Sequence, residues 1–553
     1  MNWKKPLGIS LLPLFLGLLF FAASLTPSLI PRGPVLQGIL GGTVAALGYL
    51  IGRFLLTVWR QMDLPVLSGR AAIIGHLIVG LPVLATLGNA LIKEVPWQNS
   101  IRTRMGMEPI ESFRVLQMLG LAVLVFAVLY LIGALIRMVF DRMRRRLYRY
   151  MPERRANIAG LLIVVVLVFT ITRDGLIDNL IDFFDSSYTV AQDLFENAPP
   201  PPEDSTVSGS AQSLVDWGAM GKPGRDFVTT GPNAAAISEF SGTEALKPLR
   251  VYVGRAQADD AQARADVALA ELQRIGAFER KVLIVAMPTG TGWLDPGSFD
   301  VIEYMHGGDI ATVAVQYSYL QSPLALILET DSGLQQARAL IGTVHRYWRS
   351  LPRDQRPQIY VHGLSLGAWA SMYGTDLEAL LDDPIDGGFW AGPPFPSGLW
   401  HQAMEERNEG TPYVAPEVRD GRLFRFASHV KPAGGPDGWG SMRLMFLQYS
   451  SDPIVFYQPS SLWRAPAWMH EPPAEDVSPD LSFMPVVTQF QLALDMAIAL
   501  SAPSGHGHSY YAHDYIGPWQ AVTQPDGWTD ADTARLMARC DGEKQQGCRN
   551  GKS

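Results

Sequence analysis

Five long stretches in the first third of the chain are almost free of Asp, Glu, Lys and Arg. Each is 17 to 26 residues long, and a helix needs roughly 20 apolar residues to cross the hydrocarbon core of a bilayer. The pattern therefore predicts an α-helical transmembrane bundle of about five spans within residues 1–173. The expected spans are residues 6–31, 35–58, 71–92, 115–136 and 156–172.

A different pattern begins near residue 225. Short apolar runs alternate there with stretches of helical periodicity, which is typical of a mostly parallel sheet with helices on both faces. Residues 225–553 are therefore predicted to form an α/β domain. Strands are expected at residues 250–253, 281–287, 312–317, 358–362, 388–390 and 444–449, and helices at 258–275, 331–351 and 366–380.

Residues 174–224 are predicted to link the two regions. Apolar side chains recur at helical spacing between acidic ones from 174 to 195, which indicates an amphipathic helix at the membrane surface. Pro199 to Pro202 then indicate a stiff, extended connector. The apolar segment 486–500 is also expected to be helical, facing either the bilayer or the core of the α/β domain, and the core is favoured.

The charge distribution divides the chain at the same place. Residues 1–172 hold 18 Lys and Arg against 6 Asp and Glu, a net charge of +12, whereas residues 173–553 hold 27 against 47, a net charge of −20. The total of −8, without a basic face, argues against nucleic acid as a partner. Because 48% of the residues are hydrophobic, the composition also excludes a wholly disordered chain.

The positive residues predict how the spans are oriented. With the N-terminus inside, the inner segments carry thirteen Lys and Arg and the outer segments five, in agreement with the positive-inside rule. Five spans then place the α/β domain outside the cytoplasm. The first span is expected to be retained, because four more follow it and a usual cleavage site is lacking. Cys540 and Cys548, the only cysteines, would form a local disulfide in such an oxidising compartment.

A G-x-S-x-G motif at residues 363–367 follows the strand QIYVH and opens a helix. Such a motif places its serine on a sharp turn between strand and helix, with the hydroxyl exposed at the end of the sheet. The helix N-terminus favours the negative charge that develops in acyl transfer. Ser365 is therefore the candidate nucleophile.

A serine nucleophile needs a base, and the base needs an acid that orients it. On this type of fold the order along the chain is Ser, acid, His. Asp452 directly follows the strand at 444–449 and is preferred as the acid over Asp383 and Asp386.

Four histidines follow that strand. His508 is preferred as the base, with His506 as the alternative, because both lie in a glycine-rich loop; His470 and His513 are weaker candidates. The His-x-His pair with His513 and Asp514 also resembles a metal cluster. A metal would leave the serine motif unexplained, so no metal and no cofactor is expected.

The oxyanion hole requires two backbone N–H groups aimed at the developing charge. One is expected from Leu366, directly after the nucleophile. The other is expected from the glycine-rich loop after the strand at 281–287, where Thr289 and Gly290 are the candidates. This loop lacks the lysine and the spacing of a phosphate-binding loop. The segment 395–440, rich in Pro, Gly and aromatic residues, is expected to cover the pocket as a cap.

The chain resembles a family of bacterial membrane-anchored α/β-hydrolases that have an N-terminal multi-span region and an extracytoplasmic hydrolase domain. The resemblance implies a triad of Ser365, Asp452 and His508 and a multi-pass location in the bacterial inner membrane. Family members often carry an acidic residue where this chain has Leu364. The segments that carry the resemblance are WGAMGKPGRDFV (217–228), PTGTGW (288–293), HGGDIATVAVQYSYL (306–320), GLSLG (363–367), WAGPPF (390–395), LQYSSDPIV (447–455) and GHGHSY (505–510).

Motifs and spans together predict a membrane-anchored serine hydrolase that acts on ester or thioester bonds through an acyl-enzyme, by hydrolysis or acyl transfer. The location beside the bilayer suggests a lipid or another envelope component as the acyl substrate. The oligomeric state is left open. The alternative is a non-catalytic envelope transporter or scaffold with a hydrolase-like binding domain. The complete Ser, Asp and His set argues against this alternative, because a binding domain does not need all three.

Overall fold

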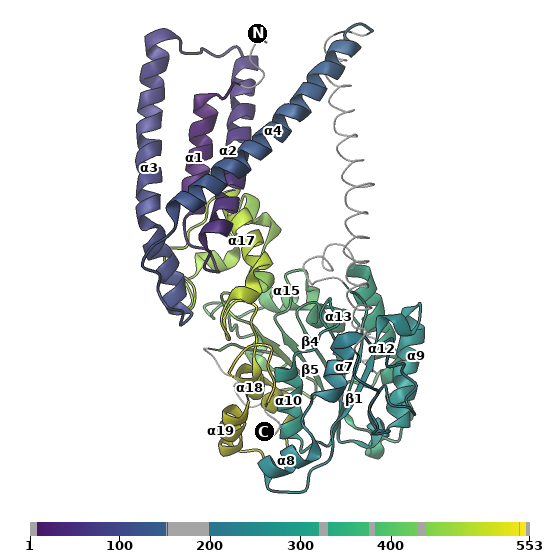
Figure 1. Ribbon diagram of the computed structural model, residues 1–553. Coiled ribbons are helices and arrows are strands. Elements are labelled where there is room, and N and C mark those ends of the chain that lie inside the picture. Colours follow the sequence, from purple (N-terminus) through teal and green to yellow (C-terminus); the bar gives the residue numbers. More distant parts are fainter. Residues whose placement is uncertain are drawn as a thin grey trace. The chain divides into compact units, whose positions relative to one another are not determined.

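The computed structural model describes residues 8–150, 152, 198–319, 330–374, 382–429, 438–540 and 542–548. The chain divides into two compact units (Figure 1). The helical unit comprises Met1–Phe183 and Gln458–Asp495, and the sheet unit comprises Phe184–Tyr457 and Met496–Ser553. The sheet unit thus differs from the predicted domain at residues 225–553, because an internal segment of that range belongs to the helical unit.

Four helices form most of the described part of the helical unit. They are α1 (Leu11–Ser24), α2 (Pro34–Gln61), α3 (Gly69–Arg104) and α4 (Val115–Leu147). The last three are long and apolar enough to cross a membrane. The fifth predicted span, residues 156–172, lies outside the described residues, as does the predicted amphipathic segment 174–195.

The first predicted span is shorter than expected. A helix was expected over residues 6–31, but α1 has 14 residues and ends at Ser24, which is less than a straight crossing needs. Pro27 and Pro31 explain the early end, because a proline disfavours helical geometry in the residue before it and cannot donate a backbone hydrogen bond. The connection that follows is packed inside the unit, with Leu25 and Leu29 buried.

Small residues let the helices of this unit approach closely. A Cβ added to Gly17 of α1 would lie 2.7 Å from the carbonyl oxygen of Ala45 in α2, and one added to Gly42 of α2 would lie 2.5 Å from that of Ala122 in α4. Backbone contact of this kind is characteristic of packed membrane helices. Away from these contacts the helices expose large apolar side chains such as Ile78, as expected of a surface that faces lipid.

The segment Gln458–Asp495 packs against the ends of these helices. It contains η6 (Pro459–Leu462), η7 (Ala467–His470) and most of α17 (Val487–Ala497). Ser478 shares a hydrogen bond with Ser100 of α3 at 2.8 Å. The apolar helix expected at 486–500 is therefore present, but up to Asp495 it belongs to the helical unit and not to the core of the sheet unit.

Seven parallel strands form the sheet, in the order β1-β3-β2-β4-β5-β7-β6. The six strands predicted from apolar runs are all present within a few residues of their expected bounds. The seventh, β6, lies inside the segment 395–440 that was expected to form a cap, and it pairs at the edge of the sheet instead. The strands are β1 (Leu249–Val253), β2 (Val282–Met287), β3 (Ile310–Val315), β4 (Gln358–Leu364), β5 (Gly387–Ala391), β6 (Phe424–Ala427) and β7 (Arg443–Leu447).

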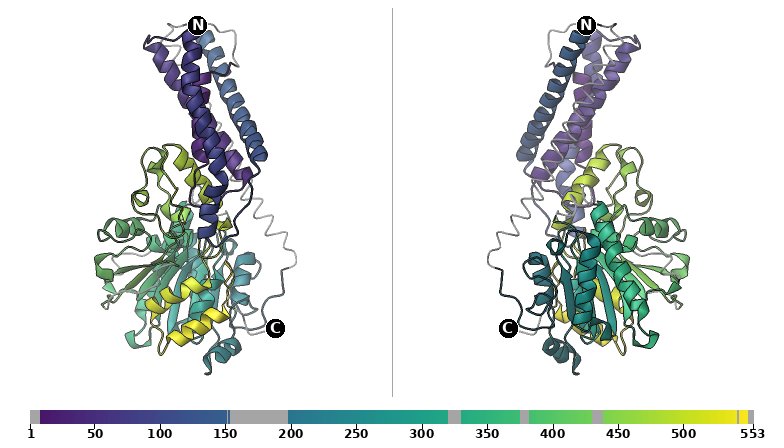
Figure 2. Two further views of the ribbon diagram at one scale, coloured as in Figure 1. Left: turned by 90° about the vertical axis from the view of Figure 1, so that its left-hand side faces the viewer. Right: turned by 90° about the vertical axis from the view of Figure 1, so that its right-hand side faces the viewer.

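Helices cover both faces of this sheet (Figures 1 and 2). One layer contains α9 (Ala261–Arg274), α12 (Thr330–Ser350) and α13 (Leu366–Gly374), and the other contains α10 (Pro296–Met305) and α18 (Ala512–Thr523). The central strands are buried on both sides, as their continuous apolar sequences predict. The remaining helices among the described residues of this unit are α7 (Gly221–Thr229), α8 (Ala234–Ser241), α15 (Gly398–Glu405), α16 (Pro453–Phe456) and α19 (Asp530–Arg539). Short 3-10 turns are also present, namely η2 (Arg255–Gln257), η3 (Ala277–Glu279), η4 (Arg353–Gln355), η5 (Arg419–Gly421) and η8 (Ala499–Ser501).

The C-terminal end of the chain is attached to this core. Cys540 and Cys548 form a disulfide, which confirms the prediction of a local bridge. The backbone N–H of Cys548 donates to Asp300 at 2.9 Å. Asp300 and Glu303 of α10 also bind the buried guanidinium of Arg250 in β1, so the charges in this part of the core are paired.

Candidate functional site

Ser365 stands on the turn between β4 and α13. Its φ of +58° lies in the left-handed region, which a non-glycine residue enters only at an energetic cost. The N–H of Ser365 donates to the carbonyl oxygen of Ala391, the last residue of β5, at 3.0 Å. Strand–turn–helix geometry and strain are therefore both present at the serine, as the G-x-S-x-G motif predicts.

Glycine is required on both sides of this turn because the backbones touch there. A Cβ on Gly363 would lie 2.2 Å from the carbonyl carbon of Gly367. A Cβ on Gly367 would lie 2.1 Å from the carbonyl oxygen of Met287, at the end of β2. These distances are shorter than any contact that a side chain can adopt, so the sharp turn depends on both glycines.

Asp452 and His508 are hydrogen-bonded to each other. The Nδ1 atom of His508 lies 2.7 Å from Oδ2 of Asp452, and both side chains are buried. The other carboxylate oxygen of Asp452 accepts from the N–H of Ile454 at 2.9 Å, which caps the short helix α16. The acid is thus held by a helix N-terminus while it holds the imidazole.

Backbone contacts fix the loop that carries His508. Gly507, which has a φ of +56°, donates its N–H to Oγ of Ser451, the neighbour of Asp452, at 2.9 Å. The N–H of His508 donates to the carbonyl oxygen of Ala499 at 3.1 Å. The histidine loop is therefore attached on one side to the turn that carries the acid and on the other side to η8.

Ser365 and His508 approach the same end of β5. The imidazole packs over Gly392, where an added Cβ would lie 2.6 Å from Cε1 of His508, and the backbone of Ser365 is bonded to Ala391. The Nε2 atom of His508 is buried and has no hydrogen-bond partner among the described residues. That nitrogen is the atom that would take a proton from a serine hydroxyl.

Tyr510 also binds the acid, although the sequence reasoning did not single it out. Its hydroxyl lies 3.0 Å from Oδ2 of Asp452, the oxygen that His508 also contacts. Burial and the charge of Asp452 raise the pKa of Tyr510 well above its usual range, so the hydroxyl stays protonated and donates. The ring stacks on Tyr449 with centroids 4.3 Å apart. Its place in the motif GHGHSY was the available signal.

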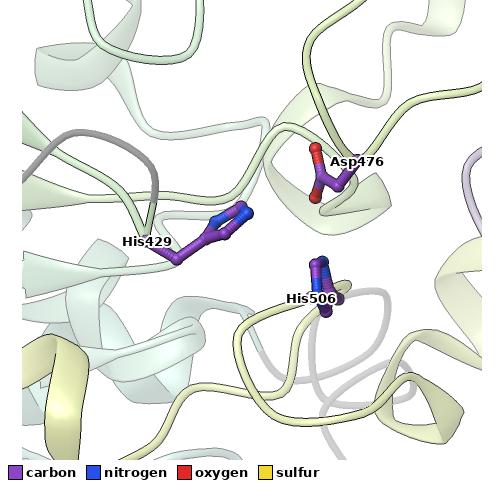
Figure 3. A group of neighbouring side chains, drawn as sticks. All are labelled: His429, Asp476 and His506. Carbon is purple, nitrogen blue, oxygen red and sulfur yellow. The ribbon is translucent and has the colours of Figure 1, made fainter. Parts of the chain in front are cut away.

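The other histidines near this loop have different neighbours. His506 packs its ring against His429, with centroids 4.9 Å apart (Figure 3). Nε2 of His513 lies 3.4 Å from the carbonyl oxygen of Cys540. His470 belongs to the helical unit, as does Asp476, the third residue drawn in Figure 3. Among the four candidates, only His508 is hydrogen-bonded to Asp452.

The alternative acids lie at the opposite end of the sheet. Asp386 directly precedes β5, and its carboxylate accepts from the N–H of Ile359 at the start of β4. Asp383 pairs with Arg356 at 2.6 Å. Since the serine turn lies at the carboxyl ends of the strands, neither carboxylate is near Ser365.

The three candidates for the oxyanion hole have different geometry. Leu366 is the first residue of α13, so its N–H has no acceptor within the helix. Thr289 uses its N–H inside its own turn, where it donates to the carbonyl oxygen of Trp293 at 3.0 Å. This bond leaves Gly290 as the candidate donor from that loop. A small cavity separates the loop from the end of β4, with Leu294, Phe299 and Leu364 in its wall.

Two buried titratable groups, His362 and Asp295, lie next to the serine turn. His362, which directly precedes Gly363 in β4, shares hydrogen bonds with Ser298 at 2.9 Å and with the carbonyl oxygen of Phe389 at 2.7 Å. Burial lowers the pKa of His362 to about 4, so this ring is neutral. Burial raises the pKa of Asp295 to about 7, although Tyr515 donates to it. Both groups line the small cavity.

Two family models match the chain. The model of an alpha/beta-hydrolase family matches residues 249–536, which is more than half of the 553 residues. The model of the N-terminus of that family matches residues 25–232. No curated protein and no solved structure matches the chain.

Proposed function

Because the chain belongs to an alpha/beta-hydrolase family, we propose that the sheet unit is a serine hydrolase that cleaves ester or thioester bonds. The observation that carries this proposal is the buried Asp452–His508 pair at the strand end that also holds Ser365 in its left-handed conformation. A strained serine beside a hydrogen-bonded acid and imidazole is the arrangement that acyl transfer requires. A domain that only binds its ligand gains nothing from this strain.

Each residue has a separate role in the proposed reaction. The Ser365 hydroxyl attacks the acyl carbonyl carbon, and its proton passes to Nε2 of His508. Asp452 keeps Nδ1 of the imidazole protonated and stabilises the imidazolium that forms. The N–H groups of Leu366 and Gly290 stabilise the negative oxygen of the tetrahedral intermediate. The imidazolium then gives its proton to the leaving alcohol or thiol, and an acyl-enzyme remains on Ser365.

A second nucleophile completes the cycle. Water, activated by His508, releases the acid in hydrolysis, whereas an alcohol or thiol acceptor would take the acyl group in transfer. The three helices that are long and apolar enough to span a membrane support anchoring to a bilayer. We therefore propose acyl esters or thioesters of lipids or other envelope components as substrates. The excess of positive residues on the inner side supports an extracytoplasmic position for the sheet unit.

The test is covalent labelling of the full chain in detergent with a fluorophosphonate probe, together with hydrolysis of a short-chain p-nitrophenyl ester. Ser365→Ala should lose the label and reduce kcat by roughly 10³-fold or more. Ser397→Ala is a matched control, because the buried hydroxyl of Ser397 has no hydrogen-bond partner among the described residues. This control should be labelled like the wild type. Full labelling of the Ser365→Ala protein would refute the proposed nucleophile.

A further inference from the structure

The candidate donor Gly290 belongs to a loop that must keep its place beside the serine turn. This oxyanion loop, residues 288–295, directly follows β2. At its start the backbones touch, since a Cβ added to Gly367 would lie 2.1 Å from the carbonyl oxygen of Met287 and 2.9 Å from that of Pro288. The first residue of the loop is therefore fixed against the turn that carries the proposed nucleophile. The direction of the Gly290 N–H depends on what holds the rest of the loop.

Side-chain packing does not fill all the space next to the oxyanion loop. The small cavity at this place is lined by Thr289, Trp293 and Asp295 of the loop and by the end of β4. The carbonyl oxygen of Gly292, in the middle of the loop, accepts from the hydroxyl of Tyr252 at 2.8 Å. A segment beside a cavity shifts more easily than one in a close-packed core. Polar contacts must therefore contribute to holding the loop in place.

Asp295, the last residue of the oxyanion loop, has a donor for each of its carboxylate oxygens. Oδ1 accepts from the N–H of Gly297 at 3.0 Å, which caps α10, and Oδ2 accepts from the hydroxyl of Tyr515 in α18 at 2.9 Å. Both side chains of this second pair are buried. Burial and the charge of Asp295 raise the pKa of Tyr515 well above its usual range, so the hydroxyl stays protonated and donates. Loss of this donor would leave a buried carboxylate oxygen without compensation.

The first turn of α18 is also attached to the acid and to the base of the proposed triad. Its first residue, Ala512, follows His508 by four positions in the chain. In the same turn, the carboxylate of Asp514 accepts from the hydroxyl of Tyr449 at 2.6 Å. The carbonyl oxygen of Tyr449 in turn accepts from the N–H of Asp452 at 3.0 Å. One helical turn is therefore connected to the acid, to the base and to the oxyanion loop, and all of these contacts lie within the sheet unit.

We propose that Asp295 and Tyr515 are positioning residues for the reaction. Their hydrogen bond attaches the oxyanion loop to the first turn of α18 and so sets the direction of the Gly290 N–H beside Ser365. This inference rests on the proposed function. Loss of the bond lets the end of the loop shift towards the cavity, and a displacement of about 1 Å costs up to about a hundredfold in rate.

The experiment measures kcat and KM for a short-chain p-nitrophenyl ester with the full chain in detergent. Asp295→Ala should lower kcat roughly tenfold to a hundredfold with a nearly unchanged KM. Tyr515→Phe should lower kcat roughly threefold to tenfold, and it should have no further effect when combined with Asp295→Ala, because its partner is already missing. Asp295→Asn should remain within about threefold of the wild type. Its amide keeps both bonds, since the oxygen accepts from Gly297 and the NH2 group donates to the hydroxyl oxygen of Tyr515.

Inhibition by an alkyl trifluoromethyl ketone distinguishes misplacement from misfolding. The oxygen of Ser365 adds to the ketone carbon of this probe, the serine proton passes to His508, and the negative oxygen of the adduct occupies the oxyanion hole. In Asp295→Ala the inhibition constant should rise by the same factor by which kcat/KM falls. Partial misfolding lowers the number of sites that a fluorophosphonate labels at completion but leaves the inhibition constant of the remaining sites unchanged. That result would overturn the inference.

The matched control is Tyr360→Phe, which makes the same chemical change on a buried tyrosine of the same unit. Its hydroxyl accepts from Arg443 at 3.0 Å near the starts of β4 and β7, away from the serine turn. Its kcat and its inhibition constant should stay within about twofold of the wild type. Wild-type values in Asp295→Ala, an additive double variant, or an Asp295→Asn protein as impaired as Asp295→Ala would overturn the inference while Ser365-dependent labelling persists. Wild-type protein that is not labelled at Ser365 would overturn the proposed function itself.

Discussion

Replacing Tyr510 with Phe tests how the proposed acid is held. The substitution removes one oxygen and leaves the ring, which stacks on Tyr449 and meets His508 edge-on with centroids 5.5 Å apart. The lost interaction is the 3.0 Å hydrogen bond to Oδ2 of Asp452. The carboxylate keeps its bonds to His508 and to the N–H of Ile454, so the change removes one donor of three.

The expected loss follows from the burial of the carboxylate. A hydrogen bond to a charged buried group contributes about 1.5–3 kcal/mol, so Tyr510→Phe should lower the free energy of unfolding of the sheet unit by about 2 kcal/mol. The hydroxyl donates to Asp452 both before and during proton transfer. Most of the lost free energy therefore lowers the stability of the fold and leaves the activation barrier unchanged. A smaller part, about 1 kcal/mol, should be lost through poorer orientation of His508, which lowers kcat roughly fivefold.

The assay is urea unfolding in detergent, followed by tryptophan fluorescence, together with ester hydrolysis. Tyr511→Phe provides the matched control, since it makes the same chemical change one residue away and the Tyr511 side chain is only partly buried. The control should change the unfolding free energy by less than about 0.5 kcal/mol. If Tyr510→Phe were as stable as this control, the hydroxyl would not be bonded to the buried carboxylate, and its assignment as a donor to Asp452 would be refuted.

Two further substitutions test the turn and the core beneath it. Gly367→Ala should abolish fluorophosphonate labelling, because the new Cβ would lie 2.1 Å from the carbonyl oxygen of Met287; Gly398→Ala, whose Cβ meets open space, should be labelled normally. His362 has a pKa lowered from 6.5 to about 4, so the unfolded chain takes up the proton first and stability falls as the pH drops from 6.5 towards 4. Over this range the wild type should lose about 3 kcal/mol more than His362→Gln, and parallel pH curves from denaturant titrations would contradict the buried neutral ring.

Local sequence patterns were sufficient to predict the elements that carry the chemistry. The turn around Ser365 is determined by residues next to one another, because only glycines at 363 and 367 permit its backbone contacts. Continuous apolar runs predicted six of the seven strands, since burial on both faces requires apolar residues at every position. The short edge strand β6 (FRFA) was not predicted, because its alternating and brief pattern resembles that of a loop.

Contacts between distant residues could not be read from the chain in this way. The choice of His508 over His506 depends on which ring meets Asp452, 56 residues earlier, and both histidines lie in the same glycine-rich loop. The role of Tyr510 likewise depends on a contact with Asp452, which its hydroxyl also binds. The N–H of Thr289 was a candidate oxyanion donor by position, but the turn to Trp293 uses it.

The division of the chain into two units shows most clearly what the sequence pattern could not predict. The sequence alone determined that an apolar N-terminal region precedes a parallel α/β sheet and that a strained serine follows β4, because burial and turn sterics act on neighbouring residues. Only the tertiary structure decided that α17 is attached through Asp495 to the connection between α1 and α2. The same apolar helical pattern is compatible with the helical unit and with the core of the sheet unit. The choice between them is made by a few buried polar contacts between residues more than 460 positions apart in the sequence.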